Sequence, residues 1–351
     1  MNSQNGTKTQ RLPTVYFSSI VTPTSMERKT LKFDAEFEKW REPVKDKMRL
    51  PKFESIDDFR NYSNLSMGAV LSQLPLQAGI IKTECKCISH DGAEVRIDRF
   101  ATAEQMAAQQ TPQPAVLFFH GGGMVVGSVG LFAPFISMQA FGSGVQFFAT
   151  EYRLAPEHPD PTPVEDCYAS LKWLSTHSAE LGIDPSRIAV MGESAGGGLA
   201  AGTALMARDR GLEPPIKQQI LMYPMLDDRS LNAPSAADLD EFVYFPLHLS
   251  KLCWECYLGK DKAGKEEADV SPYAAPGRAS SLKGLPSTYM DVGGLDLFRD
   301  ECAMYAARLA AANVQVEFHL FPGLTHGFER AAEVHGVKMA VAGRMRWIKD
   351  L

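Results

Sequence analysis

From about residue 80 onward, short continuous apolar runs alternate with longer stretches of mixed apolar and polar residues. Continuous apolar runs are typical of strands covered on both faces, and mixed stretches with helical spacing indicate helices that bury one face. The expected strands cover residues 80–88, 93–100, 115–119, 145–152, 188–191, 219–223, 288–292 and 314–321. The first two resemble a hairpin, and the later strands alternate with helices expected near Pro163, Ala195 and Phe298 and over 332–347. This alternation predicts an α/β fold with a mostly parallel, doubly wound sheet.

Two segments depart from the alternation. Residues before about 76 are more charged and helical, and three of them have the spacing of one apolar stripe: Leu31, Phe37 and Trp40. The segment that begins at Asp227 interrupts the strand series and carries many large apolar side chains, among them Phe242, Tyr244, Phe245, Leu249, Leu252, Trp254 and Tyr257. A cap over the carboxyl ends of the strands would place such residues around an apolar pocket. The alternative is a helical surface insertion that packs on itself.

Composition limits the possible functions. The 351 residues are 45% hydrophobic and 22% charged, as in soluble globular proteins with a sizeable core. A net charge of −6 without a Lys/Arg cluster argues against a nucleic-acid partner. The first eleven residues are polar and lack the apolar segment of a secretory signal, so we expect a cytoplasmic protein.

Two further patterns have structural explanations. The stretch between Glu104 and Glu151 contains no Asp, Glu, Lys or Arg, but glycines, His120 and Pro134 interrupt it, so we expect buried strands and not a membrane span. Cys253 and Cys256 have C-x-x-C spacing, which is also found in redox motifs and zinc half-sites. No second ligand pair or strand-to-helix context accompanies them, so we expect packing cysteines and neither a metal nor another cofactor.

The segment Gly192-Glu193-Ser194-Ala195-Gly196 carries the candidate nucleophile. A G-x-S-x-G motif is a weak signal by itself, but here it follows a strand-like run and precedes a helical stretch, which is the context of a nucleophile elbow. The tight turn pushes the serine side chain outward, and the flanking glycines leave room for it. The N–H of Ala195 would then face a developing oxyanion at a helix N-terminus. The alternative is a small-residue turn.

A serine nucleophile needs a base and an acid that orients the base. Of the histidines that follow the candidate acids, His319 lies in an expected strand and His335 in the last helix, whereas His326 lies in a loop after a strand. We therefore predict His326 as the base. For the acid we predict Asp296, just past the strand 288–292, with Asp300 as the alternative.

The run His120-Gly121-Gly122-Gly123 follows another buried strand. Backbone N–H groups approach a substrate oxygen closely where side chains are absent, so a glycine triplet suits an oxyanion hole. The alternatives are a glycine-rich turn or a phosphate loop, but the Gly-Lys-Ser/Thr ending of a phosphate loop is missing.

Taken together, these motifs resemble the hormone-sensitive-lipase-like family of α/β-hydrolase carboxylesterases. The matching segments are 120–123, 152–159, 192–198, 296–301 and 326–328, in the family's order. The resemblance implies Gly122 and Gly123 as oxyanion donors beside Ala195. It also implies a helical cap, with the domains 1–75 (N-terminal cap segment), 76–226 (first part of the core), 227–270 (cap insertion) and 271–351 (second part of the core). The chain departs from the family pattern at Met124, Asp160, Glu193 and Leu297, and none of these changes removes a catalytic group.

The resulting prediction is a cofactor-independent serine carboxylesterase for short- to medium-chain esters. A small-molecule ester is the expected partner, and the protein is expected to be a monomer or homodimer. Four residues are predicted to line the substrate pocket: Met124, Phe242, Phe245 and Trp254. Two alternatives remain, a lactone hydrolase with the same triad and a non-catalytic small-molecule receptor on the same fold.

Overall fold

The structure is a computed structural model that describes residues 31–48, 50, 51, 53, 55–71, 75–107 and 111–351. Residues 32–351 form one compact unit. In the described part of the chain, one eight-stranded sheet has the order β1-β2-β4-β3-β5-β6-β7-β8. The strands are β1 (Ile81–Ile88), β2 (Glu94–Ala101), β3 (Gln113–Phe119), β4 (Gln146–Thr150), β5 (Ile183–Glu193), β6 (Gln218–Met222), β7 (Ser287–Gly293) and β8 (Val316–Phe321).

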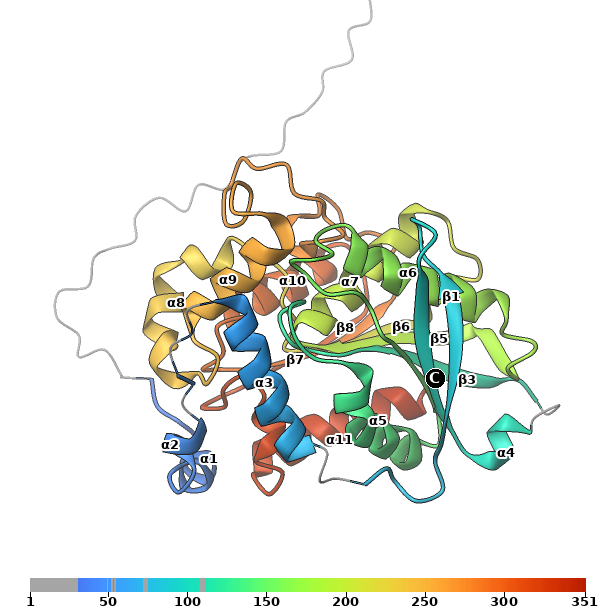
Figure 1. The fold of residues 1–351 in the computed structure, drawn as a ribbon, viewed down its shortest axis with the longest axis horizontal. Helices are drawn as coiled ribbons and strands as arrows, with labels where there is room; N and C mark the ends of the chain where they lie inside the picture. Colours follow the sequence, from blue (N-terminus) through green and yellow to red (C-terminus); the bar gives the residue numbers. More distant parts are fainter. Residues whose placement is uncertain (1–30, 49, 52, 54, 72–74, 108–110) are drawn as a thin grey trace, which may run out of the picture. The chain divides into compact units, whose positions relative to one another are not determined.

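The first strands run antiparallel, β1 to β2 and β2 to β4, and every later pair is parallel. Helices cover both faces of the sheet (Figure 1). On one face α5 (Val129–Ser143) contacts α11 (His335–Lys349), and on the other α6 (Thr162–Thr176) contacts α7 (Ala195–Asp209). Helix α10 (Arg299–Ala311) connects β7 to β8, and the short helix α4 (Ala103–Met106) follows β2. The predicted mostly parallel, doubly wound sheet is confirmed.

The observed elements differ slightly from the predicted ones at their ends. Helix α11 begins at His335, three residues later than expected, because Val334 N–H closes a turn onto the carbonyl of Ala331. Strand β8 begins at Val316, because Val314 N–H still binds the carbonyl of Leu309 and Asn313 has a φ of 58°. Both differences arise from turns that periodicity does not reveal.

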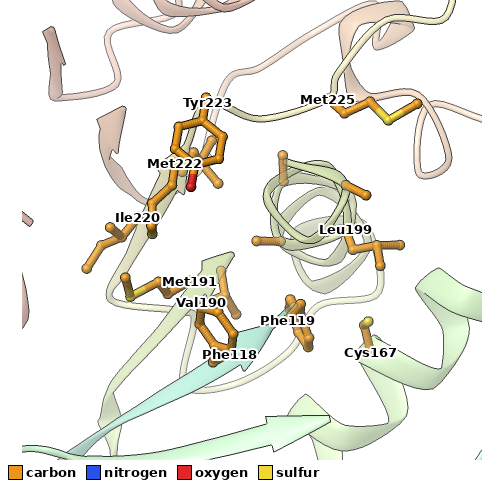
Figure 2. Close-up of a cluster of buried hydrophobic side chains, with 14 of the residues drawn as sticks. Phe118, Phe119, Cys167, Val190, Met191, Leu199, Ile220, Met222, Tyr223 and Met225 are labelled. Atoms are coloured by element: carbon orange, nitrogen blue, oxygen red, sulfur yellow. The ribbon is translucent and has the colours of Figure 1, made fainter. Parts of the chain in front are cut away.

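A buried core lies directly beneath the end of β5. Figure 2 shows side chains of β3, β5 and β6 grouped around helix α7, with Phe119, Leu199 and Cys167 where β3, α7 and α6 meet. These side chains are essentially inaccessible to solvent. The core therefore holds the carboxyl ends of three parallel strands in place, and these ends carry the candidate site.

The remaining helices come from the two segments outside the alternation. The N-terminal segment forms α1 (Ala35–Arg41), α2 (Lys45–Met48) and α3 (Ile56–Leu71), and the segment after β6 forms α8 (Pro234–Leu239) and α9 (Leu247–Leu258). Four short 3₁₀ turns complete the described structure: Ser230–Asn232, Asp240–Phe242, Pro276–Arg278 and Phe328–Arg330. The rings of Phe59 and Phe245 meet edge to face with centroids 5.5 Å apart, so the two segments pack on each other. None of the described helices has the length and apolar character needed to cross a membrane.

Candidate active site

Ser194 occupies a sharp turn between β5 and α7. Its φ of 54° and ψ of −120° lie in a region that non-glycine residues rarely adopt. Backbone hydrogen bonds fix the turn: Ser194 N–H donates to Met222 O at 2.8 Å, and Met225 N–H donates to Ser194 O at 2.9 Å. A Cβ atom at Gly192 would lie 2.1 Å from the carbonyl oxygen of Gly196, so glycine is required there. The turn is a strained elbow held by the neighbouring strand.

His326 and Asp296 lie beside this elbow, although all three residues are far apart in the sequence. His326 Nε2 is 2.9 Å from Ser194 Oγ, and His326 Nδ1 is 2.7 Å from Asp296 Oδ2. Asp296 is fully buried, and its second oxygen accepts a 2.9 Å hydrogen bond from Phe298 N–H. The carboxylate is thus fixed from both sides. The structure brings together the three residues that the sequence predicts as nucleophile, base and acid.

The surroundings of His326 stabilise its protonated form. Burial acts to lower the pKa of the imidazole, but the charge and hydrogen bond of Asp296, together with Glu193 and Glu329, outweigh burial and raise it. The rings of Tyr223 and Phe298 meet the imidazole edge to face, at centroid distances of 4.7 and 5.2 Å. These contacts restrict how the ring can turn.

The alternative base and acid residues lie elsewhere. His319 Nε2 is 2.7 Å from Glu317 Oε1 within β8, and His335 is the first residue of α11. Asp300 Oδ2 accepts a 2.6 Å hydrogen bond from the Ser235 hydroxyl. In this structure none of the three is a hydrogen-bond partner of Ser194 or of His326.

The glycine loop after β3 adopts backbone conformations and close contacts that only glycine accommodates. Gly122 has a φ of 123°, and a Cβ atom there would lie 2.1 Å from Val126 O. At Gly123 a Cβ atom would lie 2.5 Å from Cys253 Sγ of helix α9. Within the described residues, no loop or turn hydrogen bond uses the N–H groups of Gly122, Gly123 or Ala195. Ala195 begins helix α7, where intrahelical acceptors are missing.

A cavity of about 380 Å³ opens beside Ser194 and His326. Most of its wall is apolar and comes from the N-terminal segment, the glycine loop, α5, the loops after β6 and β7 and the segment between α8 and α9. The apolar lining residues are Val44, Leu50, Phe59, Val126, Phe132, Met225, Val243, Phe245, Leu297 and Phe298. An apolar pocket with a few polar groups near a nucleophile is the usual form of a small-molecule site.

Three of the four predicted pocket residues need correction, and only Phe245 is among the residues that line this cavity. Met124 is 0% exposed and its methyl group points toward Gly198 of α7. Trp254 is 1% exposed and packs beside Tyr257 within α9. Phe242 packs edge to face on Phe33, with centroids 5.2 Å apart. The aromatic side chains of the insertion thus mostly hold the helical segments together.

The cavity wall also contains residues that the sequence did not predict as part of the site. Glu193, next to the nucleophile, has a pKa raised to about 7, first by burial and then by the charge of Glu329. Tyr223 donates its hydroxyl to Glu329 Oε2 at 2.9 Å. Because Tyr223 is the last residue of the expected strand 219–223, its place at the carboxyl end of a parallel strand could have identified it.

Behind Tyr223 lies a buried ion-pair network. Arg344 of α11 binds both oxygens of Asp291 at 2.6 Å and also pairs with Glu329. Burial acts to lower the pKa of Arg344, but the negative charges of Asp291 and Glu329 outweigh burial and raise it. The network connects the last helix to the wall of the cavity.

The two cysteines of the C-x-x-C pattern lie inside helix α9 and not at its start. Cys253 is buried against the glycine loop, and burial raises its pKa beyond the ordinary range of a thiol. Among the described residues, no group of three or more His, Cys, Asp or Glu side chains is arranged to hold a metal ion.

Comparisons with known proteins agree with this geometry. A family model described as alpha/beta hydrolase fold matches residues 116–330. Esterase LipI of Mycobacterium tuberculosis is 40% identical over 220 residues, which is 62% of this chain and 67% of the relative. Carboxylesterase NlhH of the same species is 38% identical over 236 residues, 66% of this chain and 71% of the relative.

Solved structures give the same result over a longer stretch. A bacterial heroin esterase has 39% sequence identity and a TM-score of 0.82, covering 91% of this chain and 98% of the other. An esterase from the archaeon Pyrobaculum calidifontis has 29% identity and a TM-score of 0.77, covering 91% and 99%. The chain therefore belongs to the α/β-hydrolase fold family, within the hormone-sensitive-lipase-like group that its motifs resemble.

Proposed function

We propose that the protein is a serine carboxylesterase in which Ser194, His326 and Asp296 form the catalytic triad. The observation that carries the proposal is the continuous hydrogen-bonded line from Ser194 Oγ through both imidazole nitrogens to Asp296. A histidine at 2.9 Å from the serine also disfavours the receptor alternative, which would not need a functional base. The relatives named as esterases and carboxylesterases support the same reaction class.

The proposed reaction follows from these distances. Ser194 Oγ attacks the ester carbonyl carbon while His326 Nε2 takes its proton, and the carbonyl oxygen becomes an oxyanion. We assign the oxyanion to the N–H groups of Gly122, Gly123 and Ala195, which donate no loop or turn hydrogen bond within the described residues. His326 then gives the proton to the leaving alcohol, and an acyl-enzyme remains. Water, deprotonated by the same nitrogen, releases the carboxylic acid and restores the serine.

Asp296 has a positioning role in this scheme. Its carboxylate accepts Nδ1–H, which leaves the Nε2 lone pair directed at the serine and stabilises the imidazolium that forms. The buried position of Asp296 and its second bond to Phe298 N–H keep the carboxylate in one orientation.

The size and lining of the cavity support short- to medium-chain esters as substrates. About 380 Å³ is near the lower end of small-molecule pockets, and the wall is largely apolar. A long acyl chain would exceed this volume. That the protein is cytoplasmic and monomeric or homodimeric stays a prediction from the sequence.

The test is a stopped-flow assay with a p-nitrophenyl ester of a short acid. An esterase with an acyl-enzyme should show a burst of p-nitrophenol with an amplitude set by the enzyme concentration, or steady turnover if deacylation is fast. A receptor would bind the ester without releasing p-nitrophenol at a rate above the uncatalysed reaction, and that result would contradict the proposal.

A further inference from the structure

One cation in the wall of the candidate active-site cavity has no partner among the residues that the structure describes. Arg330 ends the 3₁₀ turn Phe328–Arg330, four residues after His326, and lines the same cavity as Ser194. Among the described residues, its guanidinium makes no ion pair and no hydrogen bond. The neighbouring carboxylates are engaged elsewhere, because Glu329 binds Arg344 and Tyr223, and Glu333 binds Lys338.

A second polar group belongs to the same cavity wall. Tyr244 lines the cavity, and its hydroxyl oxygen is inaccessible to solvent yet finds no hydrogen-bond partner in the described part of the chain. A buried hydroxyl without a partner costs free energy, so a ligand in the cavity that offers an acceptor to this hydroxyl gains that free energy on binding. Burial raises the pKa of Tyr244 to about 12, and the charges of Arg41 and Arg330 oppose that rise. Tyr244 therefore stays a neutral donor and lies within electrostatic range of Arg330.

The charges around this end of the cavity favour an anion. Arg41 pairs with Glu38 at 2.7 Å, whereas Arg330, an exposed residue, has no ion-pair partner among the described residues. Two carboxyl groups belong to the cavity wall: Asp296, which binds His326 and Phe298 N–H, and Glu193, beside the nucleophile, whose pKa is raised to about 7. An apolar cavity with a free guanidinium and a free phenol hydroxyl suits a ligand with an apolar body and a carboxylate.

We propose that this enzyme selects carboxylic esters that carry a second, ionised carboxylate, which Arg330 and the Tyr244 hydroxyl bind while Ser194 attacks the ester. This inference rests on the proposed esterase function and specifies its substrate class. Arg330 and Tyr244 act in substrate recognition, and the triad carries out the same reaction on neutral esters.

The experiment compares matched pairs of esters that differ in one terminal group. On the acyl side, p-nitrophenyl hexanoate is compared with the p-nitrophenyl monoester of adipic acid, in which a carboxylate replaces the terminal methyl group. On the alcohol side, butyl acetate is compared with 4-acetoxybutanoate by titration of the released acid. If the anionic ester is favoured only in the acyl-side pair, the carboxylate binds on the acyl side of the scissile bond; if only in the alcohol-side pair, it binds on the alcohol side.

The variants are read through the ratio of kcat/KM for the anionic ester to that for its neutral match, because this ratio does not depend on the amount of folded enzyme. Arg330→Met should lower the ratio by about ten- to hundredfold, the effect of losing a charge-assisted hydrogen bond. Arg330→Lys should keep most of the wild-type ratio, and Tyr244→Phe should lower the ratio by a smaller factor than Arg330→Met does. Lys338→Met is the control, since this exposed lysine pairs with Glu333 outside the cavity and should leave the ratio unchanged.

A binding measurement separates recognition from turnover. In the Ser194→Ala protein, calorimetry should give a lower Kd for the adipate monoester than for the hexanoate, and adding Arg330→Met should remove that difference. If the enzyme hydrolyses the neutral esters but the ratio is the same in wild type, Arg330→Met and Lys338→Met, the inference is overturned and the esterase function stands. If none of the esters is hydrolysed, the proposed function itself fails.

Discussion

The side chain of Arg60 ties helix α3 to the glycine loop, since its Nε donates a 2.7 Å hydrogen bond to the carbonyl oxygen of Val125. The N–H groups of Val125 and Val126 in turn both bind Gly122 O at 3.0 Å. Arg60 also pairs with both oxygens of Glu157, at 2.5 and 2.6 Å, and donates to Ala155 O. One residue of the N-terminal segment thus holds the proposed oxyanion loop in place.

We expect Arg60→Met to reduce kcat by about ten- to hundredfold with a smaller change in KM, because a displaced loop weakens the binding of the oxyanion more than that of the ester. Steady-state kinetics on p-nitrophenyl butyrate measures both constants. Arg41→Met is the matched control, because Arg41 pairs with Glu38 within α1 and, among the described residues, forms no hydrogen bond or ion pair with the glycine loop. Equal losses in the two variants would show that Arg60 stabilises the fold without positioning the loop.

Replacement of the nucleophile should nearly abolish turnover. Ser194→Ala removes the covalent route, and we expect kcat to fall by about 10⁴-fold or more while ester binding persists. Turnover is measured by p-nitrophenol release, and binding by calorimetry on the same preparation. Turnover within tenfold of wild type would show that Ser194 is not the nucleophile.

The acid limb of the pH profile should report His326. This residue must be neutral to accept the serine proton, and its pKa is raised above the ordinary value of about 6.5. Activity should therefore fall as the pH drops, with a midpoint above 6.5. His326→Ala should lose activity and this limb together, whereas His319→Ala and His335→Ala should keep both.

Glu193 should shift this limb without being part of the triad. Its carboxylate is one of the charges that raise the pKa of His326, and its own pKa lies at about 7. Glu193→Gln removes the charge, so the midpoint of the kcat/KM profile should move to lower pH. Glu333→Gln, an exposed site paired with Lys338, serves as control. A midpoint that stays the same or rises would exclude this electrostatic coupling.

The cavity wall should limit acyl length through Phe245. Each buried methylene contributes about 0.8 kcal/mol, roughly a fourfold gain in kcat/KM, until the pocket is full. Phe245→Ala should therefore move the optimum of a C2 to C16 ester series to longer chains. Phe242→Ala, in the same segment but directed at Phe33, should leave the optimum in place. An unchanged optimum in both variants would mean that Phe245 does not limit the substrate.

The ion-pair network behind the cavity should matter for stability. Arg344→Met leaves the buried Asp291 carboxylate without its cation, which we expect to cost about 3–5 kcal/mol in the free energy of unfolding. Adding Asp291→Asn should recover part of this loss, because the uncompensated charge is then gone. Arg346→Met, on the exposed side of the same helix, should cost far less, because solvent screens its ion pair with Glu317. Urea denaturation compares the three variants with the wild type. Similar losses in the free energy of unfolding for Arg344→Met and Arg346→Met would contradict the argument.

The sequence by itself was sufficient for the sheet and for the residues proposed to react. Apolar runs and turn signals located all eight strands of the described sheet, because strand burial leaves a local pattern. Ser194, Asp296 and His326 each follow a strand, and the carboxyl ends of parallel strands meet at one edge. Their proximity could therefore be inferred before any distance was known.

Only the tertiary structure decided which side chains surround the substrate site. Phe242 and Phe245 are three residues apart and equally apolar, yet Phe242 packs on Phe33 and Phe245 meets Phe59 at the cavity. The hydrogen bond from Arg60 to Val125 likewise joins segments that are distant in the chain, and Arg330 and Tyr244 meet at one cavity although they lie far apart in the sequence. Such contacts depend on how separate helices pack, which residue type and spacing do not encode locally, whereas the strands and the elbow arise from short-range preferences.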